Sequence, residues 1–115
     1  MDFHKYTGCL KLHKVFEVRK IKKLAKSDDT EAQYRLGNMY YCGENVAVNY
    51  KKAAKWQLQA AEKGHKLAEN NLSYLYEHGE GVPKNEEEAV KWLTRSAEHG
   101  YDHAQNRLGV MYKRG

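Results

Sequence analysis

Apolar residues recur along this chain with the period of an α-helix. Near residues 30–42, one helix face with the spacing i, i+4, i+7, i+8 and i+11 is formed by Ala32, Leu36, Met39, Tyr40 and Gly43. Near residues 50–63, a second face with the spacing i, i+3, i+7 and i+8 is formed by Ala53, Trp56, Ala60 and Ala61. The chain has one proline in 115 residues, and proline breaks helix interiors. The pattern predicts an all-α protein built from short amphipathic helices.

The same pattern returns every 36 residues without a gap. Four positions in the first half of the unit return twice, as Ala32, Leu36, Tyr40 and Gly43, then Ala68, Leu72, Tyr76 and Gly79, then Ala104, Leu108, Tyr112 and Gly115. In the second half, Ala53, Trp56, Ala61 and Gly64 return as Ala89, Trp92, Ala97 and Gly100. Because chance does not align so many residues at one offset, the sequence predicts repeated helix pairs.

Residues that are suited to capping helices stand at the ends of the predicted helices. Asp28 or Asp29 can cap the first helix, and Asn85 can open a later second helix. Gly64 and Gly100 stand where a residue in the left-handed conformation would end a helix. The helix boundaries are therefore supported by local chemistry as well as by the apolar period.

Two glycines interrupt the first helices of their units. Gly37 and Gly109 each follow a repeated leucine. A glycine inside a helix costs about 1 kcal/mol relative to alanine. We therefore expect a close backbone contact at both positions to compensate for this cost.

The pattern A-x-x-x-L-G-x-M-Y-x-x-G, followed by K-A-A-K-W and A-A-E-K-G, resembles the Sel1-like repeat, a relative of the tetratricopeptide repeat. The resemblance covers residues 29–115 and implies an α/α solenoid, a superhelix of antiparallel helix pairs with units 29–64, 65–100 and a partial 101–115. It also implies an adaptor or scaffold in protein–protein contact. The departures are mild, since Asn45 replaces a turn glycine and Asn49 and Asn85 replace an aspartate.

Residues 1–28 precede these units and are predicted to form a basic capping segment. A helix from about 10 to 26 would line one side with Leu12, Val15, Phe16, Ile21, Leu24 and Ala25. It fits as a worn version of a second helix, because Ala25 lies 36 residues before Ala61. At the other end, Leu108, Met111 and Tyr112 present an open edge that could support self-association.

Charge and cysteine content bear on partners and compartment. The net charge of +5 comes from residues 1–28, where eight basic residues accompany three acidic ones. The two cysteines, Cys9 and Cys42, have no metal-binding spacing; a bridge between them stays open as an alternative to the two free thiols that we expect. With no signal sequence at the start and no apolar run that could span a bilayer, we expect a cytoplasmic protein without membrane contact.

The residues show no catalytic, cofactor-binding or metal-binding pattern. His99 and His103 have the spacing of helical metal ligands, but Gly100 interrupts the helix between them, so we expect solvated histidines at the turns. The acidic run 86–88 suits a helix N-terminus rather than acid–base chemistry. Without a nucleophile–base pair or a phosphate-binding glycine loop, we expect neither an enzyme nor a bound cofactor.

The remaining candidates for a binding site lie on the first helix of each unit, on the side that faces away from the apolar stripe. We expect one continuous strip along a concave groove, formed by Tyr34, Asn38, Tyr41, Asn70, Tyr74, Glu77, Asn106, Val110 and Lys113. Tyrosine and asparagine suit binding, because a rigid ring and an amide supply contact area and hydrogen bonds. The alternative is that Tyr34 and Tyr74 pack between neighbouring repeats.

Three functions remain. The first is the binding of a partner protein or peptide in the groove, without catalysis. The second is an immunity protein that neutralises a bacterial toxin by direct binding. The third is the binding of nucleic acid or an acidic partner by the basic stretch 11–26, which few aromatics support. We favour the first of these functions.

Overall fold

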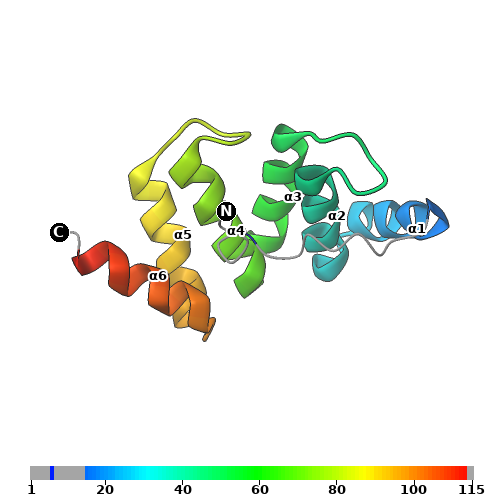
Figure 1. Cartoon of the computed structure of the whole chain (residues 1–115). Coiled ribbons are helices and arrows are strands. Elements are labelled where there is room, and N and C mark those ends of the chain that lie inside the picture. The colour runs from blue at the N-terminus through cyan, green and yellow to red at the C-terminus, as the bar shows by residue number, and fades with distance from the viewer. Residues whose placement is uncertain (1–5, 7–14, 114–115) are drawn as a thin grey trace.

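Six helices follow one another along the part of the chain that the computed structural model describes, Tyr6 and residues 15–113. They are α1 (Val15–Lys26), α2 (Thr30–Cys42), α3 (Tyr50–Glu62), α4 (Lys66–His78), α5 (Glu86–Glu98) and α6 (Asp102–Lys113), and no strand occurs among these residues. Each helix packs mainly against the next one in sequence, which gives an elongated array of 46 × 26 × 23 Å (Figure 1). This confirms the α/α solenoid predicted from the 36-residue repeat.

The helices begin at polar caps that the sequence indicates. Asp29, rather than Asp28, accepts from the Ala32 N–H at 2.8 Å and opens α2. Asn49 and Asn85 cap α3 and α5 in the same way. Because these side chains satisfy backbone donors that a helix leaves unpaired, each cap holds the boundary of its helix in place.

Turns between the helices use the left-handed backbone conformation that glycine adopts freely. Gly64 and Gly100 lie two residues after the last residues of α3 and α5, with φ of 87° and 89°, in the left-handed conformation that we expect. A Cβ atom on Gly81 would lie 2.1 Å from the Tyr50 carbonyl oxygen, so only glycine fits there. Asn45, its counterpart in the first unit, has a φ of 60°, which asparagine tolerates better than most residues.

Equivalent tryptophans lie in equivalent clusters. Trp56 packs with Ala32 and Leu36 of α2, together with Val18, Ile21 and Ala25 of α1. Trp92 packs with the matching residues one unit later, Ala68, Leu72 and Ala61. Since Ala25 takes the place that Ala61 takes in the next cluster, α1 acts as the second helix of a preceding pair, as predicted.

The described chain differs from the expectation at its N-terminal end and agrees with it at its C-terminal end, where Tyr112 is exposed. Leu12, with the rest of the predicted helix before residue 15, lies outside the described residues. Leu24 is 39% exposed instead of buried, and Val18 takes its place in the core. On α6, Val110 and Tyr112 are exposed, so the outer side of this last described helix carries apolar surface.

Gly37 and Gly109 have different surroundings. A Cβ atom on Gly37 would lie 2.7 Å from Gln57 Nε2, so the close contact is made by a side chain and not by backbone. No atom lies within 4 Å of a Cβ atom built on Gly109. A side-chain contact therefore takes the place of the expected backbone contact at Gly37, and the expectation is wrong for Gly109.

Two observations bear on the environment of the protein. Cys42, at the end of α2, is disulfide-bonded, so the expectation of a free thiol is wrong for this residue. Cys9 lies outside the described residues. None of the described helices is long and apolar enough to cross a membrane.

Candidate functional site

Four tyrosines gather against α2, α3 and α4, and we call them the tyrosine cluster. They are Tyr41 of α2, Tyr50 of α3, Tyr74 of α4, and Tyr6, which lies outside the helices. The rings of Tyr6 and Tyr41 are stacked with centroids 3.9 Å apart, and Tyr41 stacks on Tyr50 at 5.0 Å. The ring of Tyr74 stands edge-on to Tyr6 at 5.9 Å and to Tyr41 at 6.2 Å. Three helices therefore supply an aromatic surface on which the ring of Tyr6 rests.

A buried polar network meets the hydroxyl of Tyr6. Gln57 donates through Nε2 to Tyr6 Oη at 2.9 Å and to Asn38 Oδ1 at 2.8 Å. Asn71 donates to the same Asn38 oxygen at 3.1 Å. All three amide side chains are buried, and buried polar groups are stable only when hydrogen-bonded. The network therefore fixes the position of the amide that recognises the phenol.

The hydroxyl of Tyr41 is held from the turn after α4. Tyr41 Oη donates to Glu80 Oε1 at 2.8 Å. Burial, together with this hydrogen bond, raises the pKa of Tyr41 above its ordinary value. Burial raises the pKa of Tyr6 as well. Both phenols therefore stay neutral at physiological pH.

Three residues of the predicted concave strip are buried, so the strip is wrong at their positions. Tyr34 packs between repeats with its ring stacked on that of His65 at 4.5 Å, as the alternative interpretation has it. Asn38 belongs to the network described above. Asn70 is fully buried, and its Oδ1 accepts from Arg107 Nη1 at 2.6 Å. These side chains join neighbouring repeats instead of lining an open groove.

The other strip residues remain candidates for contact with a partner. Tyr41 and Tyr74 are half-buried and meet in the tyrosine cluster. Glu77 is half-buried and accepts from Arg107 Nη2 at 2.9 Å. The exposed ones lie further along the solenoid, on α6, and are Asn106, Val110 and Lys113.

Sequence reasoning missed five residues of this site: Tyr6, Tyr50, Gln57, Asn71 and Glu80. Tyr6 belongs to no repeat, and Tyr50 follows a cap where the next unit has a glutamate. Gln57 offered a signal, because the equivalent residue is Leu93, which is fully buried. A polar amide at a core position predicts a buried polar network.

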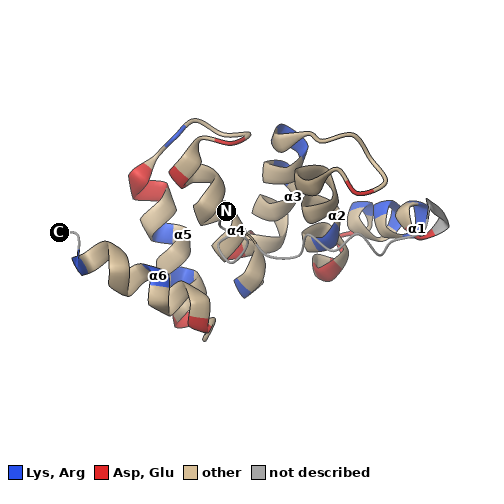
Figure 2. Cartoon of the chain, in the orientation of Figure 1, with Lys and Arg blue, Asp and Glu red and all other residues tan. Residues whose placement is uncertain are grey.

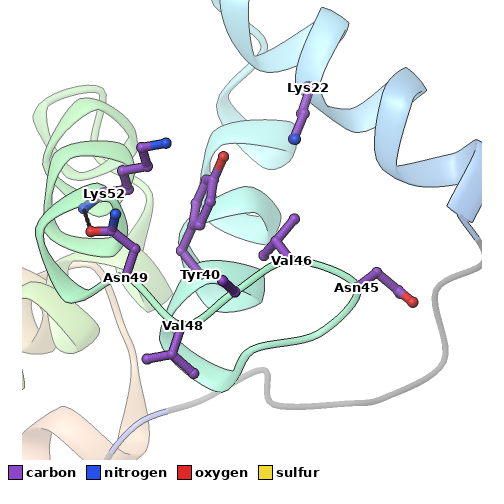
Figure 3. Close-up of a pocket in the computed structure, with 8 residues that line it drawn as sticks. Lys22, Tyr40, Asn45, Val46, Val48, Asn49 and Lys52 are labelled. Atoms are coloured by element: carbon purple, nitrogen blue, oxygen red, sulfur yellow. Dashed lines mark hydrogen bonds between the residues drawn. The ribbon is translucent and has the colours of Figure 1, made fainter.

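Basic residues occur along α1, as the uneven charge predicts (Figure 2). The exposed ones are Arg19, Lys20, Lys23 and Lys26, whereas Lys11 and Lys14 lie outside the described residues. Lys22 instead lines a cleft of about 410 Å³ beside the α2–α3 turn, with Tyr40 between Lys22 and Lys52 (Figure 3). Lys52 Nζ lies 5.3 Å from the centre of the Tyr40 ring, a cation–π contact. The cleft is thus a second, basic feature of the surface.

Histidines at the turns serve the fold. His65 accepts from the Ala68 N–H through Nδ1 at 3.2 Å and caps α4, while its Nε2 lies 2.9 Å from Glu31 Oε1. His99 Nδ1 lies 2.7 Å from Glu69 Oε1. The expectation of solvated histidines is therefore wrong for His65, whose side chain is 15% exposed, and is confirmed for His99, which is exposed although it meets Glu69. Within Tyr6 and residues 15–113, no group of three or more His, Cys, Asp or Glu side chains is arranged to hold a metal ion.

The repeat matches a known family model. The model of the Sel1 repeat matches residues 30–65, 66–101 and 102–115. A curated relative, the putative sel1-like repeat-containing protein L18 of Acanthamoeba polyphaga mimivirus, is 44% identical over 46 residues. The match covers 40% of this chain and 8% of the viral protein, so this chain spans a small part of that relative.

Solved structures with the same fold come from three bacteria. A Sel1 repeat protein from Oxalobacter formigenes has a TM-score of 0.83 and 31% identity, over 86% of this chain and 29% of that chain. A protective antigen of uropathogenic Escherichia coli with the SLR fold has a TM-score of 0.81 and 38% identity, over 85% of this chain and 21% of that chain. Cysteine-rich protein B of Helicobacter pylori has a TM-score of 0.79 and 26% identity, over 84% of this chain and 73% of that chain. Because the Sel1 model matches most of the sequence and these neighbours share its architecture, the chain belongs to the Sel1 repeat family.

Proposed function

We propose that this chain binds a partner protein or peptide through the surface of α2, α3 and α4 that carries the tyrosine cluster, and that it does so without catalysis. Sel1 repeat proteins are in general protein-interaction scaffolds. The observation that carries the proposal is the gathering of four tyrosines where a merely solvated helix surface would hold lysine and glutamate. Tyrosine is enriched in protein interfaces and at the residues that contribute most to binding.

The surface is suited to binding because it is held in place before a partner arrives. Tyr41 is fixed by stacking on Tyr50 and by its hydrogen bond to Glu80. Tyr50 is 39% exposed and Tyr74 is half-buried, so part of each residue is accessible to a partner. A preformed site loses less conformational entropy on binding than a flexible one does.

Exposed residues of α6 extend the proposed surface along the solenoid. Asn106 and Lys113 are polar and exposed, and they would form a rim in contact with the same partner. Val110 adds apolar area to this rim, whereas Tyr112 belongs to the open edge of α6, where a second copy of the chain could pack. Neutralisation of a toxin would be one form of the same binding.

The disulfide at Cys42 also bears on the cellular compartment of the protein. The cytoplasmic location expected from the sequence stays a prediction. The disulfide at Cys42 favours an oxidising compartment instead, because the cytosol keeps most protein thiols reduced.

The proposal is tested by comparative enrichment from a lysate of the source organism, with quantitative mass spectrometry. The baits are the wild-type chain, Tyr50→Ala in the cluster, and Tyr112→Ala as a matched control on α6, where Tyr112 is 69% exposed. We expect a protein that wild type and the Tyr112 variant enrich equally and that the Tyr50 variant retains several-fold less. Direct binding is then measured with the purified partner. A partner profile that is identical for all three baits would contradict the proposal.

A further inference from the structure

Tyr6 lies in the tyrosine cluster as a bound side chain would. It is 6% exposed, although no helix carries it. Its ring stacks on Tyr41, and its hydroxyl accepts from Gln57 Nε2 at 2.9 Å. We call the space that holds this ring the Tyr6 socket; Tyr41, Tyr74 and Ala54 form its walls and Gln57 lies at its floor. Both the apolar faces and the polar tip of a phenol are therefore matched.

The socket has supports that do not involve Tyr6. The ring of Tyr41 is held by Glu80, and the amide of Gln57 is held by Asn38. The first contact joins α2 to the turn after α4, and the second joins α2 to α3, which pack against each other. Departure of Tyr6 would therefore leave a shaped site, with an amide donor at its floor.

The chemistry of the socket selects a phenol. An aliphatic side chain cannot stack on Tyr41, and a charged one would lose its hydration in a site that leaves Tyr6 almost fully buried. Phenylalanine would stack but would leave the Gln57 amide without one of its acceptors. Gln57 Oε1 is also buried and accepts no hydrogen bond within the described part of the chain, so the amide can accept from a ligand hydroxyl as well.

We propose that the Tyr6 socket is a binding site for a tyrosine side chain, that Tyr6 is its intramolecular occupant, and that a partner protein binds by presenting a tyrosine that replaces Tyr6. The inference rests on the proposed function and names the chemistry of the partner. A tethered occupant competes at a high effective concentration, so it lowers the apparent affinity of the partner. Release of Tyr6 would therefore increase binding.

The test uses p-cresol, which is the isolated tyrosine side chain, with the full chain and with Tyr6→Ala. Binding is followed by NMR through the side-chain amide of Gln57. We expect p-cresol to saturate the variant with a Kd on the order of 1 mM, a reasonable affinity for so small a ligand. The wild-type chain should require at least about 10-fold more p-cresol because Tyr6 competes for the site. Toluene lacks the hydroxyl and should bind the variant about 5-fold more weakly, the factor that one net hydrogen bond supplies.

Two further variants complete the design. Tyr112→Ala removes an exposed tyrosine of α6, which is not part of the socket, and should titrate like the wild-type chain. Tyr6→Phe keeps the ring and removes the hydroxyl, so p-cresol should displace it several-fold more easily than it displaces Tyr6. If circular dichroism shows that Tyr6→Ala is unfolded, the wild-type chain is compared with Tyr6→Phe instead. Equal binding of p-cresol to wild type and the Tyr6 variants, equal binding of toluene and p-cresol, or an unshifted Gln57 amide would overturn the inference.

Failure of this inference differs from failure of the proposed function. If a captured partner binds the wild-type chain and Tyr6→Ala with the same Kd, the socket proposal is overturned and the binding surface stands. If p-cresol titrates as expected but no protein depends on Tyr50, the phenol site is supported and the proposed partner is not.

Discussion

Gly37 and Gly109 hold equivalent positions in α2 and α6, and they should respond to alanine in opposite directions. A Cβ atom on Gly37 would lie 2.7 Å from Gln57 Nε2 and 2.9 Å from Gln57 Cδ, both closer than non-bonded atoms approach. Around Gly109 the same atom would meet nothing within 4 Å. The two substitutions therefore have the same chemistry and different surroundings.

The magnitude follows from what the Gln57 amide would lose. Alanine at either position gains about 1 kcal/mol in helix propensity. At Gly37 the fully buried Gln57 would have to move, which weakens its hydrogen bonds to Tyr6 and Asn38, at about 1 kcal/mol each. Overpacking adds about 1–3 kcal/mol. We expect Gly37→Ala to lower the free energy of unfolding by about 2–4 kcal/mol and Gly109→Ala to raise it by about 0.5–1 kcal/mol.

Urea denaturation followed by circular dichroism measures both free energies, and thermal unfolding provides a second readout. The Tm should fall by roughly 10 °C in the Gly37 variant and rise by about 4 °C in the Gly109 variant. The Gly109 variant is the matched control, because it reports the helix propensity alone. Equal stabilisation by both substitutions would refute the reasoning, since it would mean that Gln57 is not held over Gly37.

Three further predictions concern the contacts between repeats and the disulfide. Arg107→Ala should lower the free energy of unfolding by about 2 kcal/mol, because it removes charged hydrogen bonds between α4 and α6; a change within 0.5 kcal/mol in urea denaturation would contradict this. The hydrogen bond from Lys63 lowers the pKa of the Asp28 carboxyl in the folded chain. The stability that this carboxylate contributes is therefore present above the ordinary pKa of aspartate and is lost as the pH falls through the lowered pKa of the folded state. In an NMR titration Lys63→Ala should return this pKa toward its ordinary value, and an unchanged pKa would exclude the pairing. Cys42 is disulfide-bonded and Cys9 is the other cysteine of the chain, so a non-reducing digest should yield their two peptides joined, and separate peptides would argue against an internal bridge.

The fold could be predicted from the sequence because a regular repeat implies the same helix packing in each unit. Residues that return every 36 positions must meet the same neighbours, and Trp56 and Trp92 do lie in matching clusters. The caps at Asp29 and Asn49 were predictable for a different reason, since each depends on residues three positions apart. Local chemistry and periodicity agree throughout α2 to α5.

The site could be predicted only in part, because the helical period does not distinguish an open surface from a surface between repeats. Tyr34 and Asn70 are buried against the following helices, whereas Asn106, at the same position of its unit, is exposed on the last described helix. Tyr41 and Tyr74 are half-buried, so their role in partner contact stays a prediction. Tyr6 could not be predicted there, because it belongs to no repeat and its contacts lie far away in the sequence.

The occupied tyrosine cluster is tested most directly by nuclear Overhauser contacts in the unliganded, oxidised chain. The account predicts contacts from the ring protons of Tyr6 to those of Tyr41 and Tyr74, with the Tyr6 signals shifted by the stacked ring at 3.9 Å. Tyr6 signals at the positions of a free tyrosine, without such contacts in an otherwise folded protein, would contradict it.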